Sequence, residues 1–167
     1  MFLSVSITAL LHTENDALRL GRCLETLYPC DHILIVDHGS SDGTVQVARE
    51  YGAQVVAAAA RCAPAEYSRF AAPGWVLSLD PCESLTESLA ASLFELKEEW
   101  KAASGGPRPD SVFSVFLREE TVHGWVDLPA AQTRLVPQSW NRWNGRFPVS
   151  EPAALALGGE LLRFVFP

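Results

Sequence analysis

The sequence predicts an α/β fold, in which a mostly parallel sheet of the Rossmann type is covered by helices on both faces. Two observations predict it. Over the first hundred residues, apolar runs typical of strands alternate with amphipathic segments typical of helices. After a Gly- and Pro-rich stretch at 104–109, the rest of the chain is short and strand-rich. Alternation of strands with short helices indicates a parallel sheet with both faces covered.

The first half supplies most of the expected elements. Residues 2–11 are apolar or small and carry no charge, so they are predicted to form a strand. A helix follows over 18–27, with Asn15 placed to cap it and Pro29 placed to end it. A second helix over 44–51 is closed by Gly52. Three more strands are predicted over 33–36, 53–58 and 75–79.

A longer helix is predicted after residue 84, where Ser84 and Glu87 have the spacing of a capping box. One of its faces carries four large apolar side chains, Leu89, Leu93, Leu96 and Trp100. Residues 104–109 form the clearest linker, which divides a single domain into parts 1–103 and 110–167. Strands are expected over 111–117, 132–136 and 160–166. The last could lie inside the sheet or at an edge that pairs with a second subunit.

Composition narrows the class of protein. A chain of 167 residues is expected to form one domain. Its formal net charge of −7 argues against nucleic acid and anionic membrane surfaces as partners. No apolar run approaches the ~20 residues of a membrane span, and no signal peptide is expected at the start. The four cysteines contain no C-x-x-C pair, which favours reduced thiols and a cytoplasmic location.

Polar side chains follow the predicted parallel strands at the points where they end. His12 and Glu14 follow the first strand. Asp37, Gly39 and Ser40 follow the second strand, and Asp80 and Glu83 follow the fourth. Ligands of open α/β sheets lie at the carboxyl ends of the strands, so the functional site is expected there. Gly39 permits a positive φ and close approach to a ligand. An ordinary strand-to-helix turn is the alternative for this loop.

The segment V-D-H-G-S-S-D-G-T at 36–44 resembles the V-D-x-G-S-x-D-G-T signature of family 2 glycosyltransferases, which have the GT-A fold. Further motifs of the family follow in its order. Residues 7–15 resemble the opening strand of the family and its N-E turn. Residues 18–27 resemble its L-x-x-x-L-x-S-L helix, and residues 74–80 resemble its G-D-W-V-L-x-L-D strand. H-G-W at 123–125 and T-R-L-V at 133–136 resemble the lipopolysaccharide-core-type branch.

The resemblance implies a GT-A-like fold and an inverting transfer of a sugar from a nucleotide-diphosphate sugar to a sugar or lipid-linked acceptor. It implies that the nucleotide lies against the end of the first strand and the Asp37 loop, a set comprising Leu11, His12, Glu14, Asp37, Gly39 and Ser40. Asp80 and Glu83 would hold Mg²⁺ or Mn²⁺ against the diphosphate. Glu151, in the V-S-E that stands where the branch has V-H-E, would take the acceptor proton.

The chain departs from the family pattern at two of these places. Cys82 stands where the family has the second Asp of D-x-D, and sulfur suits hard cations poorly. Ser150 stands where the family has His. These departures keep open a catalytically degenerate relative that binds a nucleotide sugar or a protein partner without turnover. Other α/β nucleotide-binding classes are disfavoured, because neither G-x-G-x-x-G nor a Walker motif occurs.

Several side chains have more than one interpretation. Asp80 could cap a loop and Glu83 could belong to the acidic first turn of a helix. Arg134 could bind donor phosphate through its fork of N–H groups or form a structural ion pair. Glu151 could be a solvated loop residue. Trp140 and Trp143 could stack on a sugar, pack on the sheet or form a homodimer contact.

Overall fold

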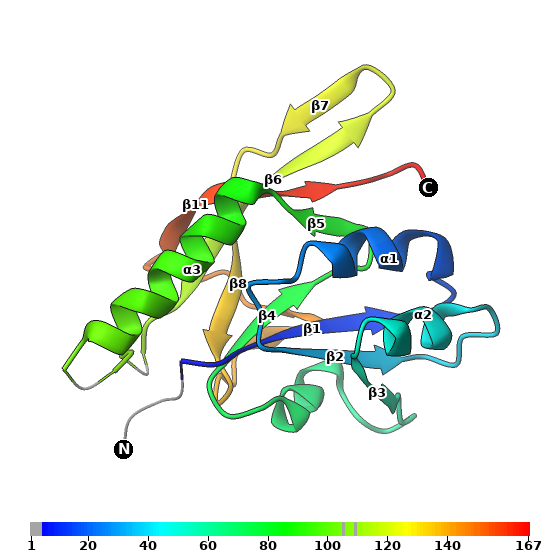
Figure 1. Ribbon diagram of the computed structural model, residues 1–167, viewed down its shortest axis with the longest axis horizontal. Coiled ribbons are helices and arrows are strands. Elements are labelled where there is room, and N and C mark those ends of the chain that lie inside the picture. The colour runs from blue at the N-terminus through cyan, green and yellow to red at the C-terminus, as the bar shows by residue number, and fades with distance from the viewer. Residues whose placement is uncertain (1–4, 105, 109) are drawn as a thin grey trace.

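The computed structural model describes residues 5–104, 106–108 and 110–167 and contains the predicted alternation of strands and helices (Figure 1). The first part comprises β1 (Ile7–Thr13), α1 (Ala17–Glu25), β2 (His32–Asp37), α2 (Thr44–Glu50), β3 (Gln54–Ala57), the 3-10 helix η1 (Pro64–Phe70), β4 (Trp75–Leu79), β5 (Glu83–Leu85) and α3 (Glu87–Ala102). The second comprises β6 (Phe113–Thr121), β7 (Gly124–Asp127), β8 (Gln132–Pro137), β9 (Trp143–Asn144), β10 (Phe147–Pro148) and β11 (Leu155–Arg163).

One sheet joins the two parts of the chain. Within the described residues it has nine strands in the order β3-β2-β1-β4-β8-β6-β11-β5, with β7 paired to β6. Strands β1 to β4 run parallel, whereas β8 is antiparallel to both β4 and β6. Strand β11 is parallel to β6 and antiparallel to β5. The sheet is therefore parallel in its first four strands and mixed beyond them, and the predicted α/β fold class is confirmed.

The two faces of the sheet are covered differently. Residues from α1, α2 and α3 share one core cluster with alternate residues of β1 and β4, and Trp100 of α3 stacks on Trp75 at 4.5 Å. On the opposite face, Tyr67 of η1 belongs to a second cluster with Leu10, and Trp143 of β9 packs against this cluster. Period-two alternation explains the division, because successive residues of β1 point to opposite faces.

Most predicted elements are confirmed, with bounds moved by a few residues. Strand β4 has the predicted bounds, and the predicted apolar face of α3 is buried. The last strand lies inside the sheet between β6 and β5, so the edge-strand alternative is wrong. The sequence did not indicate β5, β7, β9, β10 or η1.

Both predicted N-terminal helix caps are wrong. Ser84 and Glu83 form β5 with Leu85, and α3 is capped instead by Thr86, whose hydroxyl oxygen accepts from the Leu89 N–H at 3.2 Å. Asn15 has a φ of 56° and does not cap α1, because its amide oxygen accepts hydrogen bonds from another loop. In each case a tertiary contact outweighs the local signal.

Two sequence expectations involve residues outside the described part. The start of the first predicted strand, residues 2–4, lies there, as do positions 105 and 109 of the predicted linker. None of the described helices is long and apolar enough to cross a membrane.

Candidate functional site

The carboxyl ends of β1, β2 and β4 meet at one edge of the sheet, as the sequence predicted. The strand register places Thr13 opposite Asp37 and Leu11 opposite Leu79. Residues that follow these pairs therefore emerge side by side. His12, the Asp37 loop and Asp80 come together at this edge, which we call the carboxyl edge.

Asp37 is the anchor of the carboxyl edge. Its carboxylate accepts hydrogen bonds from the Thr13 hydroxyl at 2.9 Å and from the Ser40 N–H and hydroxyl at 2.9 and 2.5 Å. Burial alone would raise the pKa of Asp37, but the bonds from Ser40 and Thr13 outweigh it and lower that pKa. Gly39, with φ of 80°, makes the turn that brings Ser40 back to the carboxylate.

A second set of hydrogen bonds ties the loop after β1 to the loop after β2. The Asn15 N–H donates to the Ser40 hydroxyl at 2.9 Å, and the Asn15 amide oxygen accepts from the Ser41 N–H at 2.8 Å. Asp42 accepts from the Ala17 N–H at the start of α1. These bonds explain why Asn15 is unavailable as a cap. They also hold the two loops in one arrangement before any ligand arrives.

His12 lies beside this loop with 3% of its surface exposed. Its Nδ1 is 2.9 Å from His38 Nε2, and the ring of Tyr67 meets it edge-on at 5.7 Å. Burial, helped by the charges of Arg146 and His38, lowers the pKa of His12 to about 4. Its buried Nε2 has no hydrogen-bond partner among the described residues. The edge therefore contains a neutral imidazole with one unused polar atom.

The two other residues predicted from the end of β1 face elsewhere. Leu11 is fully buried in the core under the α-helices, so its side chain points away from the face that carries His12. Glu14 is exposed, and its N–H donates to Asp16. Their predicted roles at the nucleotide stay predictions.

Asp80 is the half-buried residue that follows β4. Burial raises its pKa, and the nearby Glu83 carboxylate raises it further, against the opposing charges of Arg134, Arg163 and Arg146. Its side chain makes no hydrogen bond within the described residues, while its N–H donates to Glu83 at 3.0 Å. Burial also raises the pKa of the neighbouring Cys82 thiol, which favours the protonated form.

Glu83 and Arg134 form a fully buried ion pair. Arg134 Nη1 and Nη2 each donate to a Glu83 oxygen at 2.8 Å, and Arg163 adds a bond at 3.0 Å from the other side. The remaining Arg134 donors bind the Ser78 carbonyl and Gln132. All five N–H groups of the guanidinium are thus used. Burial would raise the pKa of Glu83, but the Arg134 charge and hydrogen bonds outweigh it and lower that pKa.

This ion pair corrects two predictions. Arg134 has no donor left for a phosphate and no exposed surface, so it is the structural ion-pair partner of the alternative interpretation. Glu83 lies in a strand and not in the first turn of a helix. Its two oxygens are held by guanidinium groups, which argues against its predicted role as a cation ligand. The described residues contain no group of three His, Cys, Asp or Glu side chains arranged to hold a metal ion.

Glu151 does not belong to the ion pair or to the hydrogen-bonded loops described above, and it lines a cavity of its own. This cavity, of about 480 Å³, is lined by residues before β6 and β11 and by Trp140 and Arg142. The Glu151 carboxylate forms an ion pair with Arg142, whose guanidinium lies over the Trp140 ring at 4.9 Å. Glu151 is therefore not a free loop carboxylate. Among the described residues, no hydrogen bond or ion pair links it to Asp37 or Asp80.

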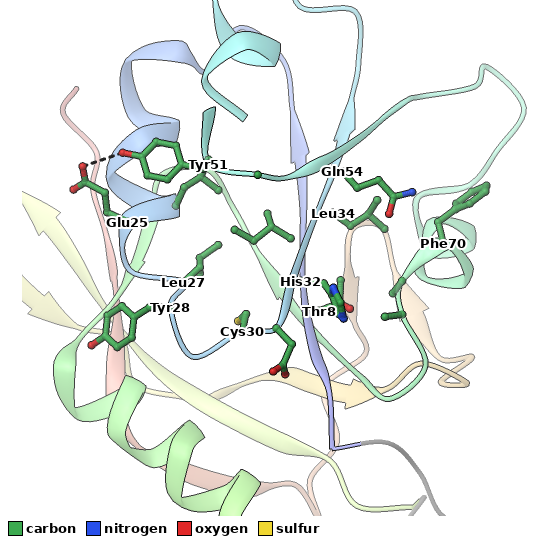
Figure 2. A pocket seen from close by; sticks show the side chains of 16 residues that line it. Thr8, Glu25, Leu27, Tyr28, Cys30, His32, Leu34, Tyr51, Gln54 and Phe70 are labelled. Carbon is green, nitrogen blue, oxygen red and sulfur yellow. Dashed lines mark hydrogen bonds between the residues drawn. The ribbon is translucent and has the colours of Figure 1, made fainter. Parts of the chain in front are cut away.

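Another cavity lies at the opposite end of the parallel strands. It has a volume of about 670 Å³ and includes Thr8 and His32, at the starts of β1 and β2. Figure 2 shows that Tyr51 and Tyr28 lie on one side of it and Phe70 on the other, with the Tyr51 hydroxyl bonded to Glu25. None of the residues predicted for nucleotide, metal or catalysis lines it.

Comparisons with known proteins support the fold. No family model matches the chain. The lipopolysaccharide core biosynthesis glycosyltransferase LpsC of Rhizobium meliloti (strain 1021) is 37% identical over 51 residues, which cover 30% of this chain and 19% of LpsC. The structure of TarS from S. aureus has a TM-score of 0.52 at 13% identity, over 80% of this chain and 28% of TarS. A mycobacterial protein has a TM-score of 0.50 at 17% identity, over 70% and 42%.

The chain thus spans less than half the length of each of these proteins. The structural likenesses show a shared α/β fold, in agreement with the expected GT-A-like arrangement.

Sequence reasoning missed two residues of the carboxyl edge. Tyr67, on η1, packs against His12, and its hydroxyl oxygen accepts a hydrogen bond from the Ala59 N–H at 2.6 Å. Arg146 lies in the turn between β9 and β10, and its charge acts on both His12 and Asp80. Neither belongs to a quoted motif. An arginine beside a glycine in the turn-forming sequence N-G-R was the available signal for Arg146.

Proposed function

We propose that this chain carries the nucleotide-sugar-binding part of a glycosyltransferase. It would transfer a sugar, with inversion, from a nucleotide-diphosphate sugar to a sugar or lipid-linked acceptor. The observation that carries the proposal is the carboxyl edge, where Asp37, Ser40 and Asn15 fix two loops in place beside Asp80. Its sequence resembles the donor-binding signature, and the similarity to LpsC points the same way.

The chemistry of such a site follows from its charges. Asp37, ionised and held by Thr13 and Ser40, offers a fixed acceptor for the N–H groups of a nucleobase. Transfer forms a bond between the acceptor oxygen and the anomeric carbon and breaks the bond from that carbon to the diphosphate. The leaving diphosphate gains negative charge, which positive groups at the edge stabilise. The acceptor proton would pass to Glu151 as general base.

The second candidate is a degenerate homologue that binds the donor or a protein partner without turnover. The environment of Glu151 supports it. Its carboxylate is paired with Arg142, and an ion-paired carboxylate is a weaker proton acceptor than a free one. Cys82 in place of the second Asp points the same way. The four cysteines are free thiols, which suits the cytoplasmic location proposed for either candidate. A homodimer stays a prediction.

A thermal-shift screen tests donor binding. The protein is melted with UDP, GDP, TDP and their sugars, with and without Mn²⁺. A ligand at 100 times its Kd should add about 2.7 kcal/mol to the free energy of unfolding. Asp37→Ala should abolish the shift, while Asp127→Ala, which removes an exposed carboxylate on β7, should keep it. No shift with any nucleotide would refute the donor-binding proposal.

Turnover separates the two candidates. Release of nucleoside diphosphate from the bound donor, with water or a sugar as acceptor, is expected from the active enzyme. Glu151→Gln should then lower the rate and leave the donor Kd unchanged. Donor binding without any release of diphosphate would favour the degenerate homologue.

A further inference from the structure

The hairpin formed by β9 and β10 carries Arg146 to the carboxyl edge. Gly145, with φ of 61°, and Arg146 form its two-residue turn. Trp143 anchors the hairpin in the apolar cluster that contains Leu10, two residues before His12. On its other strand, the Phe147 ring lies 4.0 Å from the Arg134 guanidinium. The turn is thereby fixed from both sides.

The surroundings of Arg146 include two groups of the proposed donor site. Because Leu11 lies opposite Leu79, the next residues His12 and Asp80 stand at the same level on adjacent strands. The Arg146 charge acts on both of them. Arg146 itself is half-buried and makes no hydrogen bond or ion pair with any residue of 5–104, 106–108 or 110–167. Its donors are therefore free for a ligand.

The residues present do not fit a hard divalent cation at this edge. Of the three positions that the family motif would use, Asp80 offers one carboxylate, whereas Cys82 offers sulfur, which suits a hard cation poorly. Glu83 is held by Arg134 and Arg163, so moving it to a cation would break a buried ion pair. Among the described residues, the edge therefore lacks a set of oxygen ligands for such a cation.

We propose that Arg146 binds the diphosphate of the nucleotide donor in place of a divalent cation, so that donor binding is independent of metal. The inference rests on the proposed function and adds to it the group that recognises the diphosphate. A guanidinium is suited to this task because its fork of N–H groups bonds two phosphate oxygens at once. His12, whose Nε2 has no hydrogen-bond partner in the described part of the chain, would lie next to the same phosphates.

The test measures Kd by titration calorimetry for the nucleoside diphosphate found in the screen and for the nucleoside alone. Wild-type protein, Arg146→Gln and Arg146→Lys are compared, each in EDTA and in Mn²⁺. Arg49→Gln is the matched control, since Arg49 is exposed on α2 and its loss changes the net charge equally. Thermal melts confirm that each variant is folded.

We expect wild-type protein to bind the diphosphate equally well in EDTA and in Mn²⁺. Arg146→Gln should weaken diphosphate binding about 10- to 100-fold and leave nucleoside binding unchanged, because a hydrogen bond to a charged group contributes about that much. Arg146→Lys should retain most of the affinity, and Arg49→Gln all of it.

Other outcomes overturn the proposal in distinguishable ways. Binding that requires Mn²⁺, or an Arg146→Gln variant that binds like wild type, refutes the role of Arg146 and leaves the proposed function standing. A wild-type protein that binds no nucleoside diphosphate refutes both. The dependence on Mn²⁺ is measured on the wild-type protein, so it decides the question even if a variant fails to fold.

Discussion

Asp80 and Glu83 are three residues apart, yet they belong to two regions of opposite character. Asp80 stands at the carboxyl edge, where no described residue forms a hydrogen bond with its side chain, and burial raises its pKa. Glu83 lies at the centre of a buried ion cluster with Arg134 and Arg163, which lowers its pKa. The comparison shows that two acidic residues of one motif, three positions apart, can have separate roles. One is left open to a ligand and the other holds strands together.

The largest expected effect comes from breaking the ion cluster. Glu83→Gln should lower the free energy of unfolding by about 3–5 kcal/mol, because it leaves Arg134 buried without its counterion. Urea denaturation measures it. The control is Glu98→Gln, which removes an exposed partner of Lys101 and should cost less than about 1 kcal/mol. Equal losses would contradict a special role for the buried cluster.

The second effect is a pH dependence that originates at the carboxyl edge. The pKa of His12 is about 4 in the folded protein, whereas its ordinary value, expected in the unfolded chain, is 6.5. Between these pH values the unfolded chain therefore binds the proton more readily than the folded protein does. Stability from this residue is complete above about pH 6.5 and is lost as pH falls toward 4. The loss should reach about 3 kcal/mol.

Denaturation curves from pH 4 to 7 measure this dependence. His12→Gln should flatten the slope, whereas His32→Gln, at an exposed position, should leave it as in wild type. A slope that survives His12→Gln would assign the dependence to other groups.

A smaller effect is expected from the bonds between the loops. Ser40→Ala removes one hydrogen bond to Asp37 and one from Asn15, both partly exposed, and should cost about 1 kcal/mol. Hydrogen exchange of the Asn15 and Ser41 amides should accelerate in the variant. Unchanged exchange would show that the loops are held without Ser40.

The smallest effect sharpens the contrast between the two acids. Asp80→Asn makes the same chemical change as Glu83→Gln, but the raised pKa shows that the Asp80 charge is unfavourable in the folded protein. Its loss should leave stability unchanged or increase it by less than about 1 kcal/mol. A loss of several kcal/mol, measured by denaturation at pH 7, would place Asp80 in the structural cluster with Glu83.

Local patterns were enough to predict the parallel part of the sheet. Strand β4 and the buried face of α3 follow from apolar spacing between residues that are close together in the sequence. The prediction of caps at Asn15 and Ser84 was wrong because both residues bond to partners that are distant in the sequence. Asn15 bonds to Ser41, 26 residues away, and Ser84 joins a strand that pairs with β11. No local window contains those partners.

The sequence by itself determined the order of strands and helices and the polar residues at the strand ends, because period and capping chemistry act between near neighbours. Only the tertiary structure decided what the charged residues do. Arg134 and Arg163 pair with Glu83 across 51 and 80 residues, and the full burial of Arg134 and Glu83 makes their pairing necessary. The β9–β10 hairpin brings Arg146 to His12 and Asp80, and no sequence motif predicts this placement. Charge and solvation depend on which distant groups share a site, so they are properties of the fold.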